Sequence, residues 1–204
     1  MATVVSTMFI SLDGVAEVDP TWHFPYFDEA MGLAVDDDYS ATDVLVLGRV
    51  TYDSFAGAWP GREAAGGVDA EFAARLGNTR KIVATRGQQD LGWRNVERTD
   101  DILATVSALR ADDSIGKVLV AGSISIVRQL LAADLLDELR LFVHPVAAGR
   151  GEHLFDPEAP VQPLSLVRSE LFPTGVIRLI YTPSELPSTA TYDDVTEHVP
   201  GADD

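Results

Sequence analysis

The sequence predicts an α/β fold: a mostly parallel central sheet, helices on both of its faces, and an antiparallel hairpin at its C-terminal end. Over the first two thirds of the chain, short apolar runs of strand length alternate with helical patterns, an order typical of parallel strands joined by crossover helices. Over the last third, strand-like segments follow one another with only turns between them, which is typical of antiparallel strands.

The first predicted strand leads into a long loop and a short helix. Residues 4–11 mix β-branched and apolar side chains and stop at the turn pair Asp13-Gly14, which indicates a strand that closes in a loop. The loop carries an aromatic run over residues 22–27. We expect the helix that follows to end near Gly32, because glycine is a common helix terminator.

The second strand and its helix are predicted from apolar spacing. Residues 43–47 are mainly apolar and follow an acidic run, as expected of a buried strand. Beyond Gly48, large aromatic side chains recur at spacings of three and four, which indicates a helix with one apolar face. Pro60-Gly61 is expected to end this helix, since proline breaks the helical hydrogen-bond ladder.

In the rest of the chain, strands and helices first continue to alternate, and the last strands then follow one another without helices between them. Helices are predicted over 69–76, over 101–111 and after Ser123, and strands over 81–84, 95–98, 117–121, 138–144, 165–172 and 176–182. Thr174-Gly175 separates the last two strands and predicts their hairpin. We place one domain over residues 1–183. Residues 184–204 carry six acidic side chains and no basic one, so they are predicted to form a solvated acidic tail.

Composition excludes several classes of function. With 15 basic and 32 acidic side chains, the chain has a net charge of -17, so binding to nucleic acid or to an anionic membrane surface is not expected. It contains no cysteine, and its four histidines are not spaced as zinc ligands, so we expect no metal site, and redox chemistry would need a bound cofactor. No apolar run would cross a bilayer and the amino terminus lacks the features of an export signal, which predicts a cytoplasmic location.

Three predicted strand ends carry hydrogen-bond donors. They are Gly48, Arg49 and Thr51 after the second strand, Thr85 and Arg86 after the third, and Gly122, Ser123 and Ser125 after the fifth. A helix that begins at such a point offers unpaired N–H groups and the positive end of its dipole, which favours anions. Because the carboxyl ends of parallel strands share one edge, the three together would suit a dinucleotide. Each alone also has a plain explanation: tight turns for the glycines, helix caps for the hydroxyls and solubility for the arginines.

Four motifs, in this order along the chain, resemble a known family. They are Ser11-Leu12-Asp13-Gly14, Leu47-Gly48-Arg49-Val50-Thr51-Tyr52, Ala121-Gly122-Ser123 and the late strand LRLFVHPV over residues 139–146. Together they resemble the dihydrofolate reductase-like superfamily, specifically the branch of the riboflavin-biosynthesis reductase domain, over residues 2–183. The resemblance implies a three-layer fold with about eight strands, a homodimer, and hydride transfer from NADPH to a small heterocycle or to a C=N or C=C bond.

The resemblance also implies which residues bind the cofactor and the substrate. The phosphates of NADPH would lie at Gly48, Arg49, Thr51, Ala121, Gly122, Ser123, Ile124 and Ser125, and the 2′-phosphate at Thr85 and Arg86. The nicotinamide and the substrate would border Ser11, Asp13 and Gly14. Asp13 is the candidate for a polar catalytic group, although an Asp-Gly pair also forms turns without any chemistry. The aromatic run supplies two further substrate-binding candidates, Trp22 and Phe27, as a lid, or else packs in the core or in a dimer.

Two positions depart from the riboflavin-pathway reductases. Those enzymes usually carry a lysine where this chain has Thr7, and they tend to carry a glutamate where it has Ala121. Both departures count against reduction of the riboflavin-pathway pyrimidine, 5-amino-6-(5-phosphoribosylamino)uracil. Near the first helix, Asp28 and Glu29 are interpreted as acids favoured by the helix dipole. His144, which precedes a proline at a strand end, is interpreted as structural.

Two other classes of function stay open. The chain is alternatively a non-catalytic nucleotide-binding or regulatory protein that keeps the fold without the chemistry. A third hypothesis is a folded scaffold whose acidic tail docks a partner. Oxidation of the nicotinamide cofactor by some substrate would distinguish a reductase from both of these alternatives.

Overall fold

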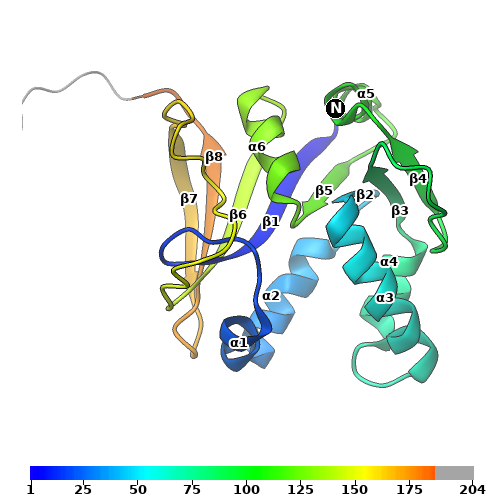
Figure 1. The fold of residues 1–204 in the computed structure, drawn as a ribbon, viewed down its shortest axis with the longest axis horizontal. Coiled ribbons are helices and arrows are strands. Elements are labelled where there is room, and N and C mark those ends of the chain that lie inside the picture. The colour runs from blue at the N-terminus through cyan, green and yellow to red at the C-terminus, as the bar shows by residue number, and fades with distance from the viewer. Residues whose placement is uncertain (187–204) are drawn as a thin grey trace, which may run out of the picture.

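The first strand of the chain lies in the interior of an eight-stranded sheet in the computed structural model, which describes residues 1–186 (Figure 1). The strands are β1 (Thr3–Ser11), β2 (Val44–Gly48), β3 (Arg80–Ala84), β4 (Val96–Thr99), β5 (Lys117–Ala121), β6 (Glu138–His144), β7 (Leu164–Leu171) and β8 (Ile177–Pro183). Their order across the sheet is β4-β3-β2-β5-β1-β6-β8-β7. Strands β1 to β6 are parallel, and β8 pairs antiparallel with β6 and β7. The predicted fold class is confirmed.

The register of β1 decides what lies at the carboxyl edge of the sheet. Thr7 pairs with Ala121, the last residue of β5, whereas Ser11 pairs with His144 at the end of β6. The last part of β1 therefore extends beyond β5 along β6 alone.

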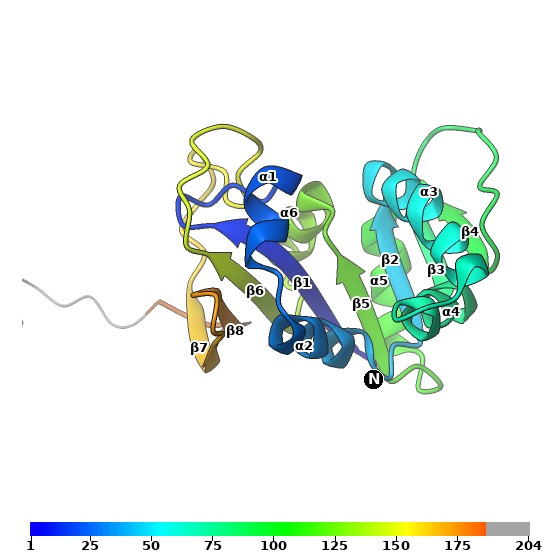
Figure 2. The ribbon, with the colours of Figure 1, turned by 90° about the horizontal axis from the view of Figure 1, so that it is seen from below.

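Helices cover the two faces of the sheet in separate groups. They are α1 (Pro20–His23), α2 (Glu29–Tyr39), α3 (Arg49–Ala65), α4 (Ala70–Asn78), α5 (Ile102–Ala111) and α6 (Ile124–Ala132), with a 3₁₀ turn η1 (Phe24–Tyr26) after α1. Helices α5 and α6 lie on one face and α1 to α4 on the other, as Figures 1 and 2 show from two directions. The sheet with a helical group on each face agrees with the predicted three layers.

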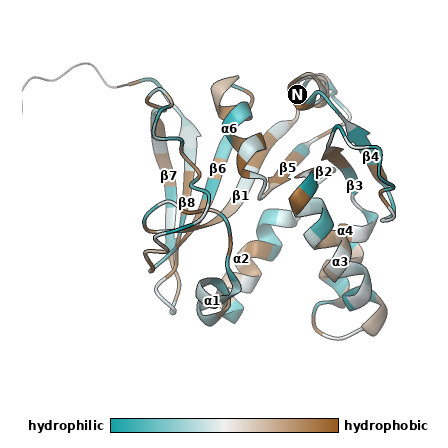
Figure 3. Ribbon diagram, in the orientation of Figure 1, coloured by the Kyte–Doolittle hydropathy of each residue, from teal (hydrophilic) through white to brown (hydrophobic). Residues whose placement is uncertain are grey.

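The central strands are apolar on both sides because helices cover both of their faces. Residues Val44, Leu45, Val46 and Leu47 of β2 are all buried. Figure 3 shows the interior strands β3 and β5 largely in the brown of hydrophobic residues, whereas the edge strand β4 is teal. Burial of apolar surface contributes about 25 cal/mol per Å², so these strands are the main source of stability.

Helix α2 continues through Gly32 to Tyr39, so the prediction that it ends near Gly32 is wrong. Its start is fixed by Asp28, whose carboxylate accepts a hydrogen bond of 2.8 Å from the amide of Met31. Met31 and Ala34 are buried beneath the helix. A glycine inside a helix costs only about 1 kcal/mol relative to alanine, which the burial of this face offsets.

Helix α3 continues through Pro60 to Ala65, so the prediction that Pro60-Gly61 ends it is also wrong. A proline inside a helix costs about 3 kcal/mol because one backbone hydrogen bond is lost. Contacts with later parts of the chain hold the last turns: the carboxylate of Glu63 accepts two hydrogen bonds of 2.7 Å from Arg94, and Arg62 donates one of 2.7 Å to Asp69. Tertiary contacts thus outweigh a local helix breaker.

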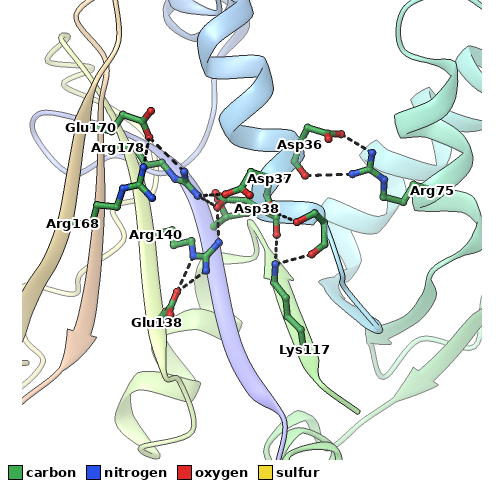
Figure 4. Close-up of polar contacts among 12 residues, drawn as sticks. Asp36, Asp37, Asp38, Arg75, Lys117, Glu138, Arg140, Arg168, Glu170 and Arg178 are labelled. Atoms are coloured by element: carbon green, nitrogen blue, oxygen red, sulfur yellow. Dashed lines mark hydrogen bonds and ion pairs between the residues drawn. The ribbon is translucent and has the colours of Figure 1, made fainter. Parts of the chain in front are cut away.

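A fully buried carboxylate ties α2 to the sheet. Asp38 accepts hydrogen bonds of 2.7 Å from the hydroxyl of Thr7 and from Arg140, and it contacts Arg178 as well. Figure 4 shows these two arginines, from β6 and β8, converging on the carboxylate, with Lys117 directed at the carbonyl end of the same helix. The Lys117 ammonium donates a hydrogen bond of 2.6 Å to the Asp38 carbonyl. Removing one partner from such a buried pair costs about 3–5 kcal/mol.

A buried lysine closes the end of α4. Lys81 on β3 donates hydrogen bonds of 2.7, 3.0 and 2.7 Å to the carbonyls of Leu76, Gly77 and Thr79, and its ammonium lies 4.4 Å from the ring centre of Trp93. Helix carbonyls at a C-terminus lack partners, and a cation there also suits the helix dipole. Lys81 therefore has a structural role.

The predicted acidic tail lies almost entirely outside the described residues, which end at Leu186. Strand β8 ends at Pro183, and the domain boundary drawn there stays a prediction. Across residues 1–186, no helix has the length and apolar character needed to cross a membrane. In the same range, no group of three or more acidic, histidine or cysteine side chains is placed to hold a metal ion.

Candidate functional site

The turns after β2 and β5 are joined into one polar junction. The hydroxyl oxygen of Ser123 accepts a hydrogen bond of 2.6 Å from the amide of Gly48 and lies 3.0 Å from the hydroxyl oxygen of Thr51. One of the two hydroxyls donates its hydrogen to the other. The remaining hydroxyl hydrogen has no strong acceptor, because the Ala121 carbonyl oxygen lies 3.4 Å from the Ser123 hydroxyl oxygen, a weak contact. The junction can thus donate one further hydrogen bond to a ligand.

The backbone of the second turn is held in an uncommon conformation. Gly122 and Ser123 are consecutive left-handed residues, with φ of 59° and 60°. Glycine adopts this conformation freely, but a serine there costs about 1–2 kcal/mol. A Cβ added to Gly122 would stand 3.4 Å from the Thr51 methyl. Strain kept at one turn suggests a functional constraint on it, and the close approach explains the glycine.

The two helices that begin at the junction start without a side-chain cap. Helices α3 and α6 begin after Gly48 and at Ser123, and neither has an acidic residue in its first turn. By contrast, α1, α2 and α5 are each capped by an aspartate carboxylate, and α4, which also lacks a cap, has a glutamate in its first turn. The first-turn amides of α3 and α6, those of Arg49 to Thr51 and of Ile124 and Ser125, are left for an anion to bind.

Arg49 places a charged group beside the junction. Its Nε donates to both carboxylate oxygens of Asp53 at 2.9 and 2.8 Å, an (i, i+4) ion pair on α3. This hydrogen bond raises the pKa of Arg49 further, so the guanidinium stays charged. Its Nη1 atom is buried and has no hydrogen-bond partner within residues 1–186. An unpartnered buried donor of this kind is costly unless a ligand accepts from it.

The third strand end lies next to the first. Gly48 pairs with Ala84 in the register of β2 and β3, so Thr85 and Arg86 follow directly beside the junction. The Thr85 hydroxyl accepts a hydrogen bond of 3.0 Å from the amide of Gly87 and shapes the turn. The exposed guanidinium of Arg86 pairs with no side chain within residues 1–186. The structure therefore brings together all the predicted cofactor-binding positions of β2, β3 and β5.

Asp13 fastens one loop to another. Its carboxylate accepts hydrogen bonds of 2.5 Å from the Ser11 hydroxyl, 2.9 Å from the Ala148 amide and 2.7 Å from the Gly149 amide. The hydrogen bond from Ser11, followed by those from the two amides, lowers the pKa of Asp13 to about 2. Asp13 is therefore anionic at neutral pH, so it cannot give up a proton there. Its role as the polar catalytic group stays a prediction. In that role Asp13 would act as an anion that orients the substrate or stabilises charge on it.

The aromatic run surrounds a pair of histidines. Trp22 lies edge-on to the ring of His144 with centres 5.1 Å apart, and Phe27 lies edge-on to His23 at 5.6 Å. Phe27 keeps 42% of its surface exposed. The run thus combines packing with exposure, and both interpretations made from the sequence keep support. The pairing of His23 with His144 was missed, since 121 residues separate them and no local pattern announces it.

A surface cavity of the described residues lies elsewhere. It measures about 380 Å³ and lies between β3, β4 and α5, with Arg80, Glu97 and Asp112 on its wall. None of the predicted site residues lines it. The candidate site is thus defined by its hydrogen-bond donors and by the starts of α3 and α6.

The model of the RibD C-terminal domain family matches residues 2–178. A curated relative, the uncharacterized protein YyaP of Bacillus subtilis (strain 168), is 27% identical over 184 residues, which cover 87% of this chain and 93% of that protein.

Solved structures share the fold at low identity. A putative riboflavin biosynthesis protein from Shewanella sp. PV-4 matches 91% of this chain and 100% of its own, with a TM-score of 0.67 and 16% identity. A pyrimidine reductase-like protein from Corynebacterium diphtheriae matches 90% of this chain and 92% of its own, with a TM-score of 0.64 and 16% identity. The Thermotoga maritima diaminohydroxyphosphoribosylaminopyrimidine deaminase/5-amino-6-(5-phosphoribosylamino)uracil reductase matches 90% of this chain but 57% of its own, with a TM-score of 0.59 and 18% identity.

Proposed function

This chain belongs to the RibD C-terminal domain family, and from this premise we propose that it is an NADPH-dependent reductase of a small heterocycle or of a C=N or C=C bond. The family is the reductase domain of riboflavin-biosynthesis enzymes, which supports an oxidoreductase. Bound NADPH would supply the hydride. The residues of the chain would bind and orient the cofactor and the substrate.

One observation carries the proposal: the hydrogen-bonded junction of Gly48, Thr51 and Ser123. It sets the starts of α3 and α6 side by side, so the amides of both first turns can bind one pyrophosphate. The charged Arg49 adds a donor whose Nη1 has no partner within the described residues. These features fit a polyphosphate ligand despite the acidic character of the whole chain. The helix amides and the Arg49 guanidinium make the potential at the junction itself positive, and this local potential decides the binding.

The preference for NADPH over NADH depends on Arg86 in this proposal. Its exposed guanidinium follows β3, next to the junction, where the 2′-phosphate of the adenosine would lie. Arginine binds phosphate through two parallel hydrogen bonds, so it discriminates well between a phosphate and a hydroxyl. Thr85 shapes this turn through its contact with the Gly87 amide.

The substrate would lie between the end of β1 and the aromatic run in this proposal. Ser11, Asp13 and Gly14 border that space from β1, and Trp22 and Phe27 border it from the loop. The hydroxyl of Thr7 is occupied by Asp38, and Ala121 offers no charge at its position. Both observations support a substrate other than the phosphoribosylated pyrimidine of the riboflavin pathway.

The proposal includes a homodimer. Exposed apolar side chains on the edge strand β7, those of Leu166, Val167 and Leu171, support a contact there, since an exposed apolar edge strand favours association. Light scattering coupled to size-exclusion chromatography measures the mass directly. A monomer at micromolar concentration would refute this part alone.

Titration with NADPH and NADH tests the cofactor assignment. Removing the charge-assisted phosphate contact of Arg49 by Arg49→Ala should cost about 1.5–3 kcal/mol with both nucleotides, which is about a 10- to 100-fold weaker Kd. Arg86→Ala should weaken NADPH by a similar factor and leave NADH unchanged. Arg80→Ala is the matched control, because it removes an equal charge at the amino end of β3.

Turnover separates the reductase from a nucleotide-binding protein without chemistry. Oxidation of NADPH, followed at its nicotinamide absorbance with a panel of pterins, pyrimidines and cyclic imines, is expected with at least one substrate. Tight binding of NADPH without turnover on any member would favour the binding protein. Parental affinity in both Arg49→Ala and Arg86→Ala would show that the cofactor site is wrongly placed.

A further inference from the structure

Two buried histidines from distant parts of the chain are hydrogen bonded to each other. The Nδ1 atom of His23, at the end of α1, lies 3.1 Å from the Nε2 atom of His144, at the end of β6. His23 is 6% exposed and His144 is fully buried. Burial lowers the pKa of both rings, for His23 to about 4 with the charge of His144 as the second cause. Both are therefore neutral at pH 7, and each carries one ring hydrogen.

A backbone carbonyl determines which nitrogen of each ring holds that hydrogen. The Nδ1 atom of His144 lies 3.0 Å from the carbonyl oxygen of Phe142, which can only accept, so His144 donates from Nδ1. Its Nε2 must then accept, and the hydrogen in the 3.1 Å contact belongs to Nδ1 of His23. The Nε2 atom of His23 is left as a pure acceptor. It has no hydrogen-bond partner within residues 1–186 and is not among the fully sealed polar atoms.

Aromatic rings pack around the ring that carries this acceptor. The ring of Phe9 lies 4.3 Å from that of His23, Phe24 lies at 5.2 Å and Phe27 at 5.6 Å, while Trp22 packs on His144. A small set of apolar rings around one oriented polar atom is how proteins bind planar molecules. Packing alone would explain the rings. It would not explain why the Nε2 atom of His23 has no hydrogen-bond partner within the described residues.

The register places the acceptor next to the junction. Thr7 pairs with Ala121 at the end of β5, and Phe9 lies two residues further along β1, about 7 Å at the usual rise of a strand. The ring of His23 lies tilted against that of Phe9 at the same carboxyl edge. His23 therefore lies at the same edge of the sheet as Gly122, beside the part of β1 that continues past β5.

We infer that His23 Nε2 is a substrate-binding acceptor that selects planar ligands carrying a ring N–H or an equivalent donor, and that His144 is a positioning residue that fixes its tautomer. The inference rests on the proposed function for the planar class of its ligand. It adds a specificity determinant that the resemblance does not imply. A ligand without a donor would leave the Nε2 lone pair buried and unpaired, which is the basis of the discrimination.

Two probes that share one ring system test the inference. Lumazine, a pteridine-2,4-dione, carries two ring N–H groups, and 1,3-dimethyllumazine carries a methyl group in place of each. In the presence of NADP⁺, the parent chain is expected to bind lumazine about tenfold more tightly, the effect of one satisfied hydrogen bond. His23→Phe keeps an aromatic ring and removes the acceptor, so this variant should bind the two probes with about equal affinity. His153→Phe, at an exposed histidine, is the matched control and should keep it.

The role of His144 is tested through the state of His23. Two-bond ¹H–¹⁵N spectra should find His23 protonated at Nδ1 in the parent chain, and lumazine should shift its Nε2 resonance alone. His144→Phe should mix the two tautomers of His23 and remove the preference. His144→Gln, whose amide oxygen can accept the same hydrogen, should restore part of it. A merely structural role for His144 would leave the tautomer unchanged.

Several outcomes overturn the inference. It fails if the parent binds neither probe or both equally, if His23→Phe retains the preference, or if His23 carries its hydrogen on Nε2. The spectra of the parent decide the question even if the phenylalanine variants do not fold. NADPH titration of the same samples reports separately on the proposed function: loss of cofactor binding with an intact probe preference would refute the reductase and leave the acceptor in place.

Discussion

The hydroxyl of Thr7 donates a hydrogen bond of 2.7 Å to the carboxylate of Asp38, a fully buried residue 31 positions later in the chain. In the riboflavin-pathway reductases that this chain resembles, a lysine usually stands at the place of Thr7. Here Arg140 and Arg178 already supply two positive charges to the same carboxylate. A hydroxyl therefore completes the site without adding a third buried cation.

Thr7→Val should lower the free energy of unfolding by about 1.5–3 kcal/mol, because a buried carboxylate would lose one of its donors while the volume stays nearly constant. Urea denaturation followed by circular dichroism measures this change. Thr3→Val alters an exposed position of the same strand and should stay within about 0.5 kcal/mol of the parent. Equal stability of the Thr7 variant and the parent would mean that the hydrogen bond adds nothing to folding.

Gly122→Ala should reduce both stability and NADPH affinity. The left-handed backbone at φ 59° penalises a side chain by about 1–2 kcal/mol, and the new methyl would stand beside Thr51 at the junction. Gly66→Ala also places a side chain on a positive-φ backbone, at φ 70° and ψ -175°, where the penalty is at least as large, and no atom lies within 4 Å of the added methyl. Thermal unfolding should find both variants destabilised. Isothermal titration should find weaker NADPH binding for Gly122→Ala alone, and parental affinity there would separate the turn from the cofactor.

Asp13→Asn should loosen the loop that contains Ala148 and Gly149, since the amide replaces a charged acceptor of three hydrogen bonds. Faster hydrogen exchange at those two amides is the expected result, with Asp156→Asn, in another turn of the same region, as the control. The pKa of Asp13 falls from 3.8 to about 2 on folding. Its contribution to stability is therefore complete above about pH 4 and is lost as the pH falls toward 2.

The pH-rate profile of the reductase supplies a second measurement on Asp13. A carboxyl that titrates near pH 2 contributes no ionisation to activity between about pH 5 and 8. Asp13→Asn should consequently lower the rate by a constant factor across that window. A profile whose inflection moves in the variant would identify Asp13 as a titrating catalytic group.

Lys81→Met should remove a rise in stability at alkaline pH. Burial, followed by the charge of Arg94, lowers the pKa of Lys81 from 10.5 to about 8. Between these two values the unfolded chain holds the proton more tightly than the folded protein, so raising the pH from 8 to 10.5 increases the free energy of unfolding, by up to about 3 kcal/mol. Urea denaturation at several pH values should record this rise in the parent. An equal rise in the variant would assign it to another group.

The sequence allows most of the sheet to be predicted because its strands are short apolar runs bounded by turn residues. The residues over 138–144 were expected as a strand and form β6. The two errors occur where local rules meet distant contacts. Gly32 and Pro60 are helix breakers by propensity, but buried Met31 and the Glu63–Arg94 pair hold their helices beyond them. Neither contact can be recognised before the fold is known.

The candidate site divides in the same way. Glycine and hydroxyl residues at strand ends indicate the turns around Gly48 and Gly122, because close backbone approach has a local signature. The mutual hydrogen bonds of Thr51 and Ser123 depend on the order of strands, and the pairing of His23 with His144 depends on how α1 packs. Residues so far apart in the chain form no local or periodic pattern from which their contact could be predicted.

The position of β1 between β5 and β6 has a consequence for biosynthesis. The ribosome releases β1 before the other strands of the sheet, and its neighbours begin only at Lys117 and Glu138, so a nascent chain must carry both edges of β1 without partners over more than a hundred further residues. Closing such long loops is entropically slow, and bare strand edges invite pairing with other chains. Truncated translation products are therefore expected to aggregate or to recruit chaperones, whereas the finished domain is not.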